Sequence, residues 1–276
     1  MSEQWGKGDE DFNPLWSGLL DARKSGWYNA DTGELVSGFP VTAGDRVLDV
    51  GCGDGTEALF CARQGAHVTF TDIDESKIEH VSGRFEELDA PGGFRSVVCD
   101  SNPLLVDSED ATRIICREVL EHVDDPVQVM SEMARVGTPG ALYILSVPGE
   151  TGELVQKAFA PPEYFQHPNH IRIFSEDDFT SLVTNAGLEV LECNRNGFFW
   201  VMWMSMVWII QQEMEEKGEL DHNSLVGSFQ PPFHQHLHDW GKLWRYVLSS
   251  PRGLAFKEQM DQVLPKNLVI LARKPA

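Results

Sequence analysis

The stretch that most constrains the fold of this chain is VLDVGCGDGT, residues 47–56. An apolar strand runs here into alternating glycines, at a turn where the backbone must come close to a ligand. Glycine suits such a turn because it accepts positive φ and has no Cβ in the way. A helix over 56–63 follows, and its free N–H groups would face the same crevice. The order predicts a ligand-binding turn at the end of a parallel strand.

The spacing of the glycines separates two classes of ligand. A dinucleotide fingerprint, G-x-G-x-x-G, needs a glycine at position 56. The chain has Thr56 there, and its third glycine is Gly55, so a nicotinamide oxidoreductase is disfavoured. The form Asp-x-Gly-x-Gly-x-Gly resembles motif I of the class I methyltransferases that use S-adenosylmethionine. This resemblance covers about residues 40–195 and 266–274.

Strand and helix signals alternate along most of the chain. Strands are expected at 46–50, 67–73, 94–99, 111–117, 141–147, 188–193 and 267–273. Helices are expected at 56–63, 75–88 and 126–136, and from the cap at Ser175 to Gly187. Such alternation builds right-handed crossovers and a parallel sheet. With the resemblance, it predicts an α/β, Rossmann-like, doubly wound seven-stranded sheet whose last strand is antiparallel, with helical cap insertions.

The same reading divides the chain into three parts. Residues 1–35 form an N-terminal helical lid, with a helix near 14–24. Residues 36–196 plus 265–276 form the methyltransferase core. Residues 197–264, between the sixth and seventh strands, form an aromatic-rich helical cap. The connection 148–174 is also too long for an ordinary loop.

The net charge, the cysteines and the first residues limit the partners and the cellular compartment that we expect. The net charge of −21 repels phosphate backbones, so no nucleic acid is expected as a substrate. The five cysteines are scattered and form no C-x-x-C pair, which favours buried, reduced thiols in a cytoplasmic protein. The polar, acidic first residues do not read as a secretory signal.

The resemblance also implies where the cofactor binds. Asp72 ends the second strand, and its carboxylate would accept hydrogen bonds from both ribose hydroxyls; Asp74 is a rival. Asp100 and Ser101 would meet the adenine, although a helix cap or Asx turn is the alternative there. The other expected cofactor contacts are Asp49, Gly51, Cys52, Gly53, Ile73, Arg117 and Glu118.

The run Val119-Leu-Glu-His-Val123 resembles the branch of small-molecule methyltransferases that includes ubiquinone-biosynthesis and sugar-modifying O-methyltransferases. Methyl transfer requires alignment of acceptor, methyl group and sulfur, and a hydroxyl acceptor is helped by a general base. His122 is predicted to be that base or a substrate orienter; packing within the next helix is the alternative. His170 is a second catalytic candidate. The predicted acceptor-side residues are Tyr28, His167, Arg172, Trp200 and Trp203.

The segment 198–210, FFWVMWMSMVWII, is too short to span a membrane. Three interpretations stay open: a buried helix of the cap or of a homodimer interface, a wall for an apolar acceptor, or a segment dipping into a membrane surface. The acidic residues 213, 215 and 216 that follow would repel anionic lipid, so no stable membrane insertion is expected.

The run His234-Gln-His-Leu-His238 invites a metal interpretation, because histidines alternating on a strand would share a face. No nearby cysteine completes a zinc set. A polar wall of the acceptor pocket is favoured instead, and no metal is expected.

These observations together predict an enzyme that transfers a methyl group from S-adenosylmethionine, leaving S-adenosylhomocysteine, to a small-molecule or glycan acceptor. Oxygen is the favoured acceptor atom. The alternatives are N- or C-methylation of a small molecule, and a non-catalytic module that only binds S-adenosylmethionine.

Overall fold

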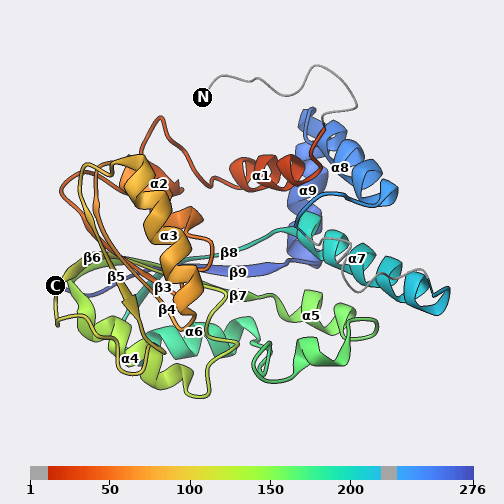
Figure 1. Cartoon of the computed structure of the whole chain (residues 1–276). Helices are drawn as coiled ribbons and strands as arrows, with labels where there is room; N and C mark the ends of the chain where they lie inside the picture. The colour runs from red at the N-terminus through yellow and green to blue at the C-terminus, as the bar shows by residue number, and fades with distance from the viewer. Residues whose placement is uncertain (1–11, 219–228) are drawn as a thin grey trace. The chain divides into compact units, whose positions relative to one another are not determined.

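The computed structural model describes residues 12–218 and 229–276 (Figure 1). The first eleven residues of the expected N-terminal lid and part of the expected cap therefore lie outside the described residues. The chain divides into two compact units. We call them the sheet unit, Gly26–Glu150 with Phe165–Arg195 and Asn267–Ala276, and the helical unit, Met1–Ser25 with Thr151–Tyr164 and Asn196–Lys266. Residues 26–35 thus group with the sheet, and residues 151–164 with the helices.

A seven-stranded sheet forms the centre of the sheet unit, and its strand order is β5-β4-β3-β6-β7-β9-β8. Its strands are β3 (Arg46–Val50), β4 (His67–Asp72), β5 (Phe94–Val98), β6 (Ala111–Arg117), β7 (Gly137–Pro148), β8 (Glu189–Asn196) and β9 (Asn267–Arg273). Strands β3 to β7 pair in parallel, whereas β9 pairs antiparallel with β7. The prediction of a seven-stranded sheet with an antiparallel last strand is confirmed. A small hairpin of β1 (Glu34–Val36) and β2 (Phe39–Pro40) precedes it.

Four helices flank this sheet, and their first turns follow the capping chemistry of the sequence. They are α2 (Thr56–Arg63), α3 (Glu75–Leu88), α4 (Pro126–Val136) and α6 (Glu176–Asn185). Side chains of Asp74, Asp125 and Ser175 accept backbone N–H hydrogen bonds at the starts of α3, α4 and α6, as N-cap residues do. Helices α2 and α3 pack on β3, β4 and β5, whereas α4 and α6 pack on β7 and β9.

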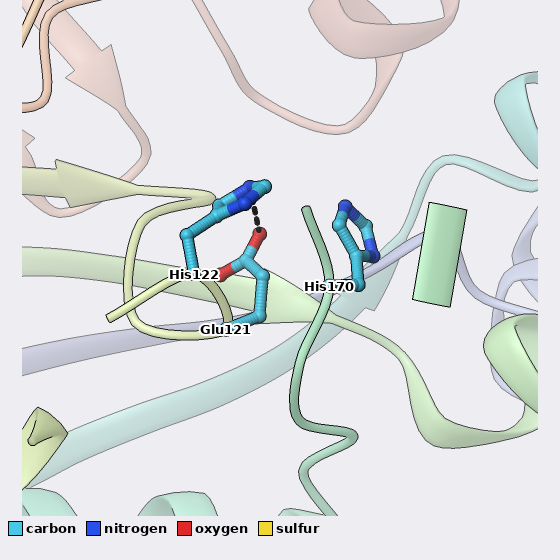
Figure 2. A group of neighbouring side chains, drawn as sticks. All are labelled: Glu121, His122 and His170. Atoms are coloured by element: carbon cyan, nitrogen blue, oxygen red, sulfur yellow. Dashed lines mark ion pairs between the residues drawn. The ribbon is translucent and has the colours of Figure 1, made fainter. Parts of the chain in front are cut away.

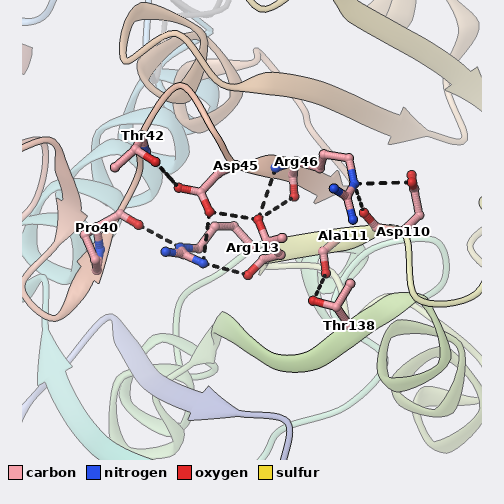
Figure 3. Close-up of polar contacts among 9 residues, drawn as sticks. Pro40, Thr42, Asp45, Arg46, Asp110, Ala111, Arg113 and Thr138 are labelled. Carbon is pink, nitrogen blue, oxygen red and sulfur yellow. Dashed lines mark hydrogen bonds and ion pairs between the residues drawn. The ribbon is translucent and has the colours of Figure 1, made fainter. Parts of the chain in front are cut away.

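The amino ends of β3 and β6 are tied by a polar network (Figure 3). Asp45 accepts hydrogen bonds from the Thr42 N–H and the Thr112 hydroxyl, both at 2.8 Å, and pairs with Arg113 at 3.1 Å. Burial would raise the pKa of Asp45, but the hydrogen bonds from Thr112 and Thr42 outweigh it and hold the pKa below its usual value. This network is structural, because ligands of parallel sheets bind at the carboxyl ends.

The helical unit is built from α1 (Leu15–Lys24), α7 (Phe198–Glu216), α8 (Gln235–Val247) and α9 (Pro251–Val263), together with α5 (Glu150–Gln156) from its second residue on. Its core is aromatic: Phe199 stacks on Trp240 at 5.8 Å, and Trp240 on Trp244 at 5.3 Å. Helix α7 begins where the apolar run begins and continues past 210. Within the described residues, no helix combines the length and apolar character needed to cross a bilayer.

A buried network of ion pairs and hydrogen bonds joins α1, α7, α8 and α9 of this unit. The Lys257 ammonium of α9 lies 3.6 Å from the Asp21 carboxylate of α1 and also pairs with Asp261. The Trp244 indole N–H donates to Asp21 at 2.8 Å, and the Phe198 backbone N–H donates to Asp261 at 2.9 Å. Each buried charge therefore has an opposite charge and a hydrogen bond, which is the condition for tolerating it in a protein interior.

Candidate functional site

A cavity of about 870 Å³ opens in the sheet unit at the carboxyl ends of β3, β4, β5 and β6. This is the edge where parallel α/β sheets bind ligands. The predicted site residues that line it are Tyr28, Asp49, Gly51, Cys52, Gly53, Asp72, Ile73, Asp100, Ser101, Arg117, Glu118, His122 and His167. Thirteen residues that are far apart in the sequence thus meet at one cavity.

The glycine turn after β3 shows why each glycine is needed. Gly51, Gly53 and Gly55 have φ of 69°, 52° and 73°, a region that residues with a Cβ rarely adopt. A Cβ on Gly51 would lie 2.3 Å from the Val119 side chain, and one on Gly55 2.7 Å from Val81. A Cβ on Gly53 would meet nothing within 4 Å, so Gly53 faces open space.

Asp72 is held in place by the backbone around the cavity. Its Oδ2 accepts from the Gly53 N–H and its Oδ1 from the Asp74 N–H, both at 3.0 Å. Its rival Asp74 does not line the cavity, and its carboxylate accepts from Ser76 at the start of α3. These hydrogen bonds hold the pKa of Asp74 below its usual value. The geometry favours Asp72 as the ribose ligand.

Asp49 is a buried carboxylate at the bottom of the glycine turn. It is 3% exposed, and its Oδ2 has no hydrogen-bond partner among the described residues. Burial, and then the nearby Glu57, raise its pKa. A buried acceptor beside a cavity suits a ligand that brings a positive charge and N–H donors, because an unpaired buried carboxylate is costly.

Tyr28, Glu57 and Arg117 form a linked group on the wall of the cavity. The Tyr28 hydroxyl donates to Glu57 Oε1 at 2.6 Å, and the Arg117 guanidinium pairs with the same oxygen. The Arg117 guanidinium also lies 4.2 Å from the centre of the Trp27 ring. Glu57 also lines the cavity and is not among the residues predicted from the sequence, although its place in the first turn of α2 was a usable signal.

Glu118 and the residues after β5 complete the cofactor side. Glu118 Oε1 accepts from the Asn267 amide at 2.6 Å and from the Ser146 hydroxyl at 3.1 Å. Asp100 accepts from the Asn102 N–H at 3.1 Å, as in the Asx turn considered above, while it also lines the cavity. Ser101 has φ of 66°, which turns the chain beside the cavity.

His122 comes from the segment after β6 and lines the cavity, and Figure 2 shows its ring beside Glu121 and His170. Its Nδ1 is 3.1 Å from the Pro168 carbonyl oxygen, and its Nε2 is 3.7 Å from Glu121 Oε1. Burial holds the pKa of His122 below its usual 6.5. The ring is therefore neutral at neutral pH, the form in which it can accept a proton.

Four other predicted residues are not among the described residues that line the cavity. His170 is 8% exposed and packs edge-on against His122, with ring centres 5.0 Å apart. The Arg172 guanidinium donates to the carbonyl of Val123 at 2.9 Å, so it holds the backbone next to His122. Trp200 and Trp203 belong to the helical unit, where Trp203 is fully buried. Their acceptor-binding roles stay predictions.

The histidines at 234–238 do not alternate along a strand. His234 caps α8, and His236 and His238 lie in its first turn. Among the residues that the structure describes, the group that could hold a metal ion is Glu121, His122 and His170. No pattern in the sequence predicts that these three residues meet.

The residues of the cavity fit S-adenosylmethionine. Gly53 leaves room for the ligand beside the backbone, Asp72 presents a fixed carboxylate, and Asp49 presents a buried acceptor without a partner. The parallel sheet, the glycine turn and the acid at the end of β4 define the core of a class I methyltransferase.

A family comparison gives the same result. Residues 28–193 match the model of a methyltransferase domain, and the chain belongs to that family. All the residues that line the cavity lie within this matched range.

Curated relatives carry methyltransferase names. The chain is 32% identical to Methyltransferase GfsG of Streptomyces halstedii over 163 residues, 58% of this chain and 59% of that protein. It is 28% identical to a ubiquinone biosynthesis O-methyltransferase of Paracidovorax citrulli over 169 residues, 59% of this chain and 65% of that protein. The matches therefore span less than two thirds of these relatives.

Among solved structures, a putative methyltransferase of Bacillus halodurans aligns with a TM-score of 0.53 at 18% identity, covering 86% of this chain and 95% of that one. At this identity the likeness shows the fold alone.

Proposed function

We propose that this protein transfers the methyl group of S-adenosylmethionine to an oxygen of a small-molecule acceptor, with His122 as base or orienter. The observation that carries the proposal is one cavity that joins Asp72, Gly53 and Asp49 to the neutral ring of His122. The relative from Paracidovorax citrulli, named as an O-methyltransferase, supports oxygen as the acceptor atom.

The cofactor side supplies binding and orientation. S-adenosylmethionine, when bound, supplies a methyl group on a positively charged sulfur. Asp72 would accept from the ribose hydroxyls, while its hydrogen bonds to Gly53 and Asp74 keep the carboxylate in place. The unpartnered oxygen of Asp49 would accept from the ammonium of the methionine part. Such fixed contacts align the reacting atoms, which is the main catalytic requirement of an in-line displacement.

The acceptor side needs one group that takes or directs a proton. Pro168 offers only a carbonyl oxygen, so Nδ1 of His122 carries the hydrogen and Nε2 presents a lone pair. As a base, His122 would take the proton of the acceptor hydroxyl on Nε2 while the C–O bond forms and the C–S bond breaks. Glu121, at 3.7 Å from Nε2, would stabilise the resulting imidazolium.

The experiment combines a binding assay with a turnover assay. We expect S-adenosylhomocysteine to bind the protein in calorimetry and NADH not to bind. A screen of hydroxylated acceptors should then release S-adenosylhomocysteine. His122→Gln should lower turnover by about 10²–10⁴-fold, the usual contribution of a general base, while the affinity for S-adenosylhomocysteine stays close to that of the unmodified protein.

Four outcomes would contradict parts of the proposal. Binding of NADH without binding of S-adenosylhomocysteine would remove the methyltransferase assignment. Unchanged turnover of His122→Gln would remove His122 from the base role. Tight binding of S-adenosylhomocysteine without turnover of any acceptor class would favour the non-catalytic binding module. Products methylated on nitrogen or carbon would move the chemistry to that acceptor atom.

A further inference from the structure

The side chains of Glu121, His122 and His170 lie next to one another (Figure 2). One ligand atom from each of the three lies within 4.8 Å of the others. Glu121 and His170 are buried, and His122 is half-buried and lines the cavity. Two imidazoles and one carboxylate at this spacing form a ligand set for a transition metal.

Backbone contacts hold the two segments that carry these side chains. The Ile171 N–H donates to the Glu121 carbonyl at 3.0 Å, and the Arg172 guanidinium donates to the Val123 carbonyl at 2.9 Å. The His122 ring binds the Pro168 carbonyl from the other side. The ligands are therefore fixed in relation to one another before any ion binds, which is the requirement for a precise metal site.

The orientation of His122 is that of a metal ligand. Because Pro168 can only accept, the Nδ1–H donates to its carbonyl oxygen, and the Nε2 lone pair is left on the side of Glu121. Metal-bound histidines nearly always donate their second ring N–H to a carbonyl or carboxylate in this way.

We propose that Glu121, His122 and His170 bind a divalent transition-metal ion, of which Zn²⁺ is the best match. Ligand atoms around tetrahedral zinc at about 2.0–2.1 Å lie about 3.3 Å apart. The His122 Nε2 and Glu121 Oε1 are 3.7 Å apart, so small side-chain rotations would bring these two atoms to the spacing of zinc ligands. Mg²⁺ and Ca²⁺ fit poorly, because they prefer oxygen ligands.

The position of His122 gives the ion a role beside the acceptor. His122 is the one of the three ligands that lines the cavity, so an ion bound to its Nε2 lies at the cavity wall. Three protein ligands leave a coordination position open, as in catalytic zinc sites. The ion would lower the pKa of an acceptor hydroxyl, and His122 would act as an orienter. This role rests on the proposed methyl transfer; the binding of the ion does not.

Calorimetric titration of the full chain with Zn²⁺, after treatment with a chelator, tests the binding. We expect one equivalent to bind with micromolar affinity or better, and an excess of Mg²⁺ not to compete. Glu121→Gln and His170→Asn should each weaken Zn²⁺ by at least about 10²-fold, because each removes one of three ligands. His80→Asn, which changes an exposed histidine on α3, is the matched control and should bind Zn²⁺ as the unmodified protein does.

A spectroscopic measurement keeps the test independent of the variants. Co²⁺ bound to the unmodified chain should give the visible bands of a nitrogen and oxygen site, without a sulfur-to-metal charge-transfer band. Such a band would place the ion on one of the cysteines and overturn the proposal. Absence of stoichiometric Zn²⁺ binding would overturn it as well, and so would equal affinity in folded Glu121→Gln and His170→Asn.

Cofactor binding separates a failure of this site from a failure of the proposed function. Neither Glu121 nor His170 lines the cavity, so both variants should bind S-adenosylhomocysteine within about twofold of the unmodified protein. If the ion assists the acceptor, the chelated protein keeps this affinity and loses turnover, and Zn²⁺ restores it. Full turnover of the chelated protein would overturn the role in catalysis.

Discussion

The sheet unit and the helical unit both bury carboxylates, but they surround them differently. In the helical unit, Asp21 and Asp261 face the Lys257 ammonium and accept hydrogen bonds from ring or backbone N–H groups. In the sheet unit, Asp49 and Asp72 line a cavity, and one oxygen of Asp49 has no partner among the described residues. Buried carboxylates that are matched inside the protein hold helices together, whereas a buried carboxylate with an unpartnered oxygen beside a cavity is available to a ligand.

The comparison makes a first prediction for stability. Lys257→Met should lower the free energy of unfolding by about 3–5 kcal/mol, because it leaves two buried carboxylates without their cation. Lys217→Met is the matched control: Lys217 pairs with Glu213 four residues earlier at 3.6 Å, and both side chains are exposed. It should cost less than about 0.5 kcal/mol. Urea unfolding followed by tryptophan fluorescence measures both, and equal effects would break the comparison.

The second prediction concerns ligand binding in the sheet unit. Asp72→Ala should weaken S-adenosylhomocysteine by about 10²-fold, or about 2.7 kcal/mol, because a charge-assisted contact to the ribose and the hydrogen bond to Gly53 are both lost. Asp74→Ala is its control. It removes the cap of α3, so it should cost about 1 kcal/mol in stability and leave the affinity nearly unchanged. Calorimetry would show the opposite pattern if Asp74 were the ribose ligand.

A third prediction separates two kinds of glycine in the same turn. Gly55→Ala places a Cβ 2.7 Å from Val81 in a left-handed conformation, so it should destabilise the protein by about 2 kcal/mol or more. Gly53→Ala has the left-handed conformation without the contact and should cost about 1 kcal/mol. Its Cβ would point into open space, so it should affect ligand binding more than stability. Thermal unfolding and calorimetry on the two variants measure the contrast, and equal destabilisation would contradict it.

Local patterns were enough to predict much of the sheet unit. The strand at 46–50, the glycine turn and the helix at 56–63 were read from contiguous residues, and the structure has them at Arg46–Val50 and Thr56–Arg63. The preference for Asp72 over Asp74 also followed from position, since only Asp72 ends a strand. A short-range pattern carries this information because a strand, a turn and a cap each involve only a few neighbouring residues.

Contacts between side chains from segments far apart in the sequence could not be predicted from such local patterns. A hydrogen bond from the Ile171 N–H to the Glu121 carbonyl holds the segments that carry Glu121 and His170 together. No helix or strand periodicity in the sequence connects these positions. Arg172 is predicted on the acceptor side, and no local pattern predicts that its guanidinium also donates to the backbone carbonyls of Leu120 and Val123. The pairing of Lys257 with Asp21 likewise requires knowledge of how α1 and α9 pack. Tertiary packing decides such contacts, and the sequence around each residue does not encode them.

The smallest expected effect is a pH dependence that differs between the units. Burial lowers the pKa of His122 below 6.5, whereas burial raises the pKa of Asp21 to about 6. The folded protein therefore disfavours protonation of His122, and the associated stability is present above pH 6.5 and is lost as the pH falls through the folded pKa. For Asp21 the sign is opposite: the stability that it contributes is present below its unfolded pKa of 3.8 and is lost as the pH rises through about 6.

Turnover provides the test at His122. Because neutral His122 is the active form, kcat/KM should fall by less than half between pH 8 and pH 6.5, and should fall about tenfold per pH unit only well below that. His122→Gln should remove this acid limb, whereas Asp21→Asn should leave it in place and change only the pH dependence of unfolding. A half-maximal kcat/KM at or above pH 6.5 would show that burial does not control this ring. The distinction between buried ionisable groups that are matched inside the protein and those that serve the reaction would then fail at His122, on which the proposed chemistry depends most.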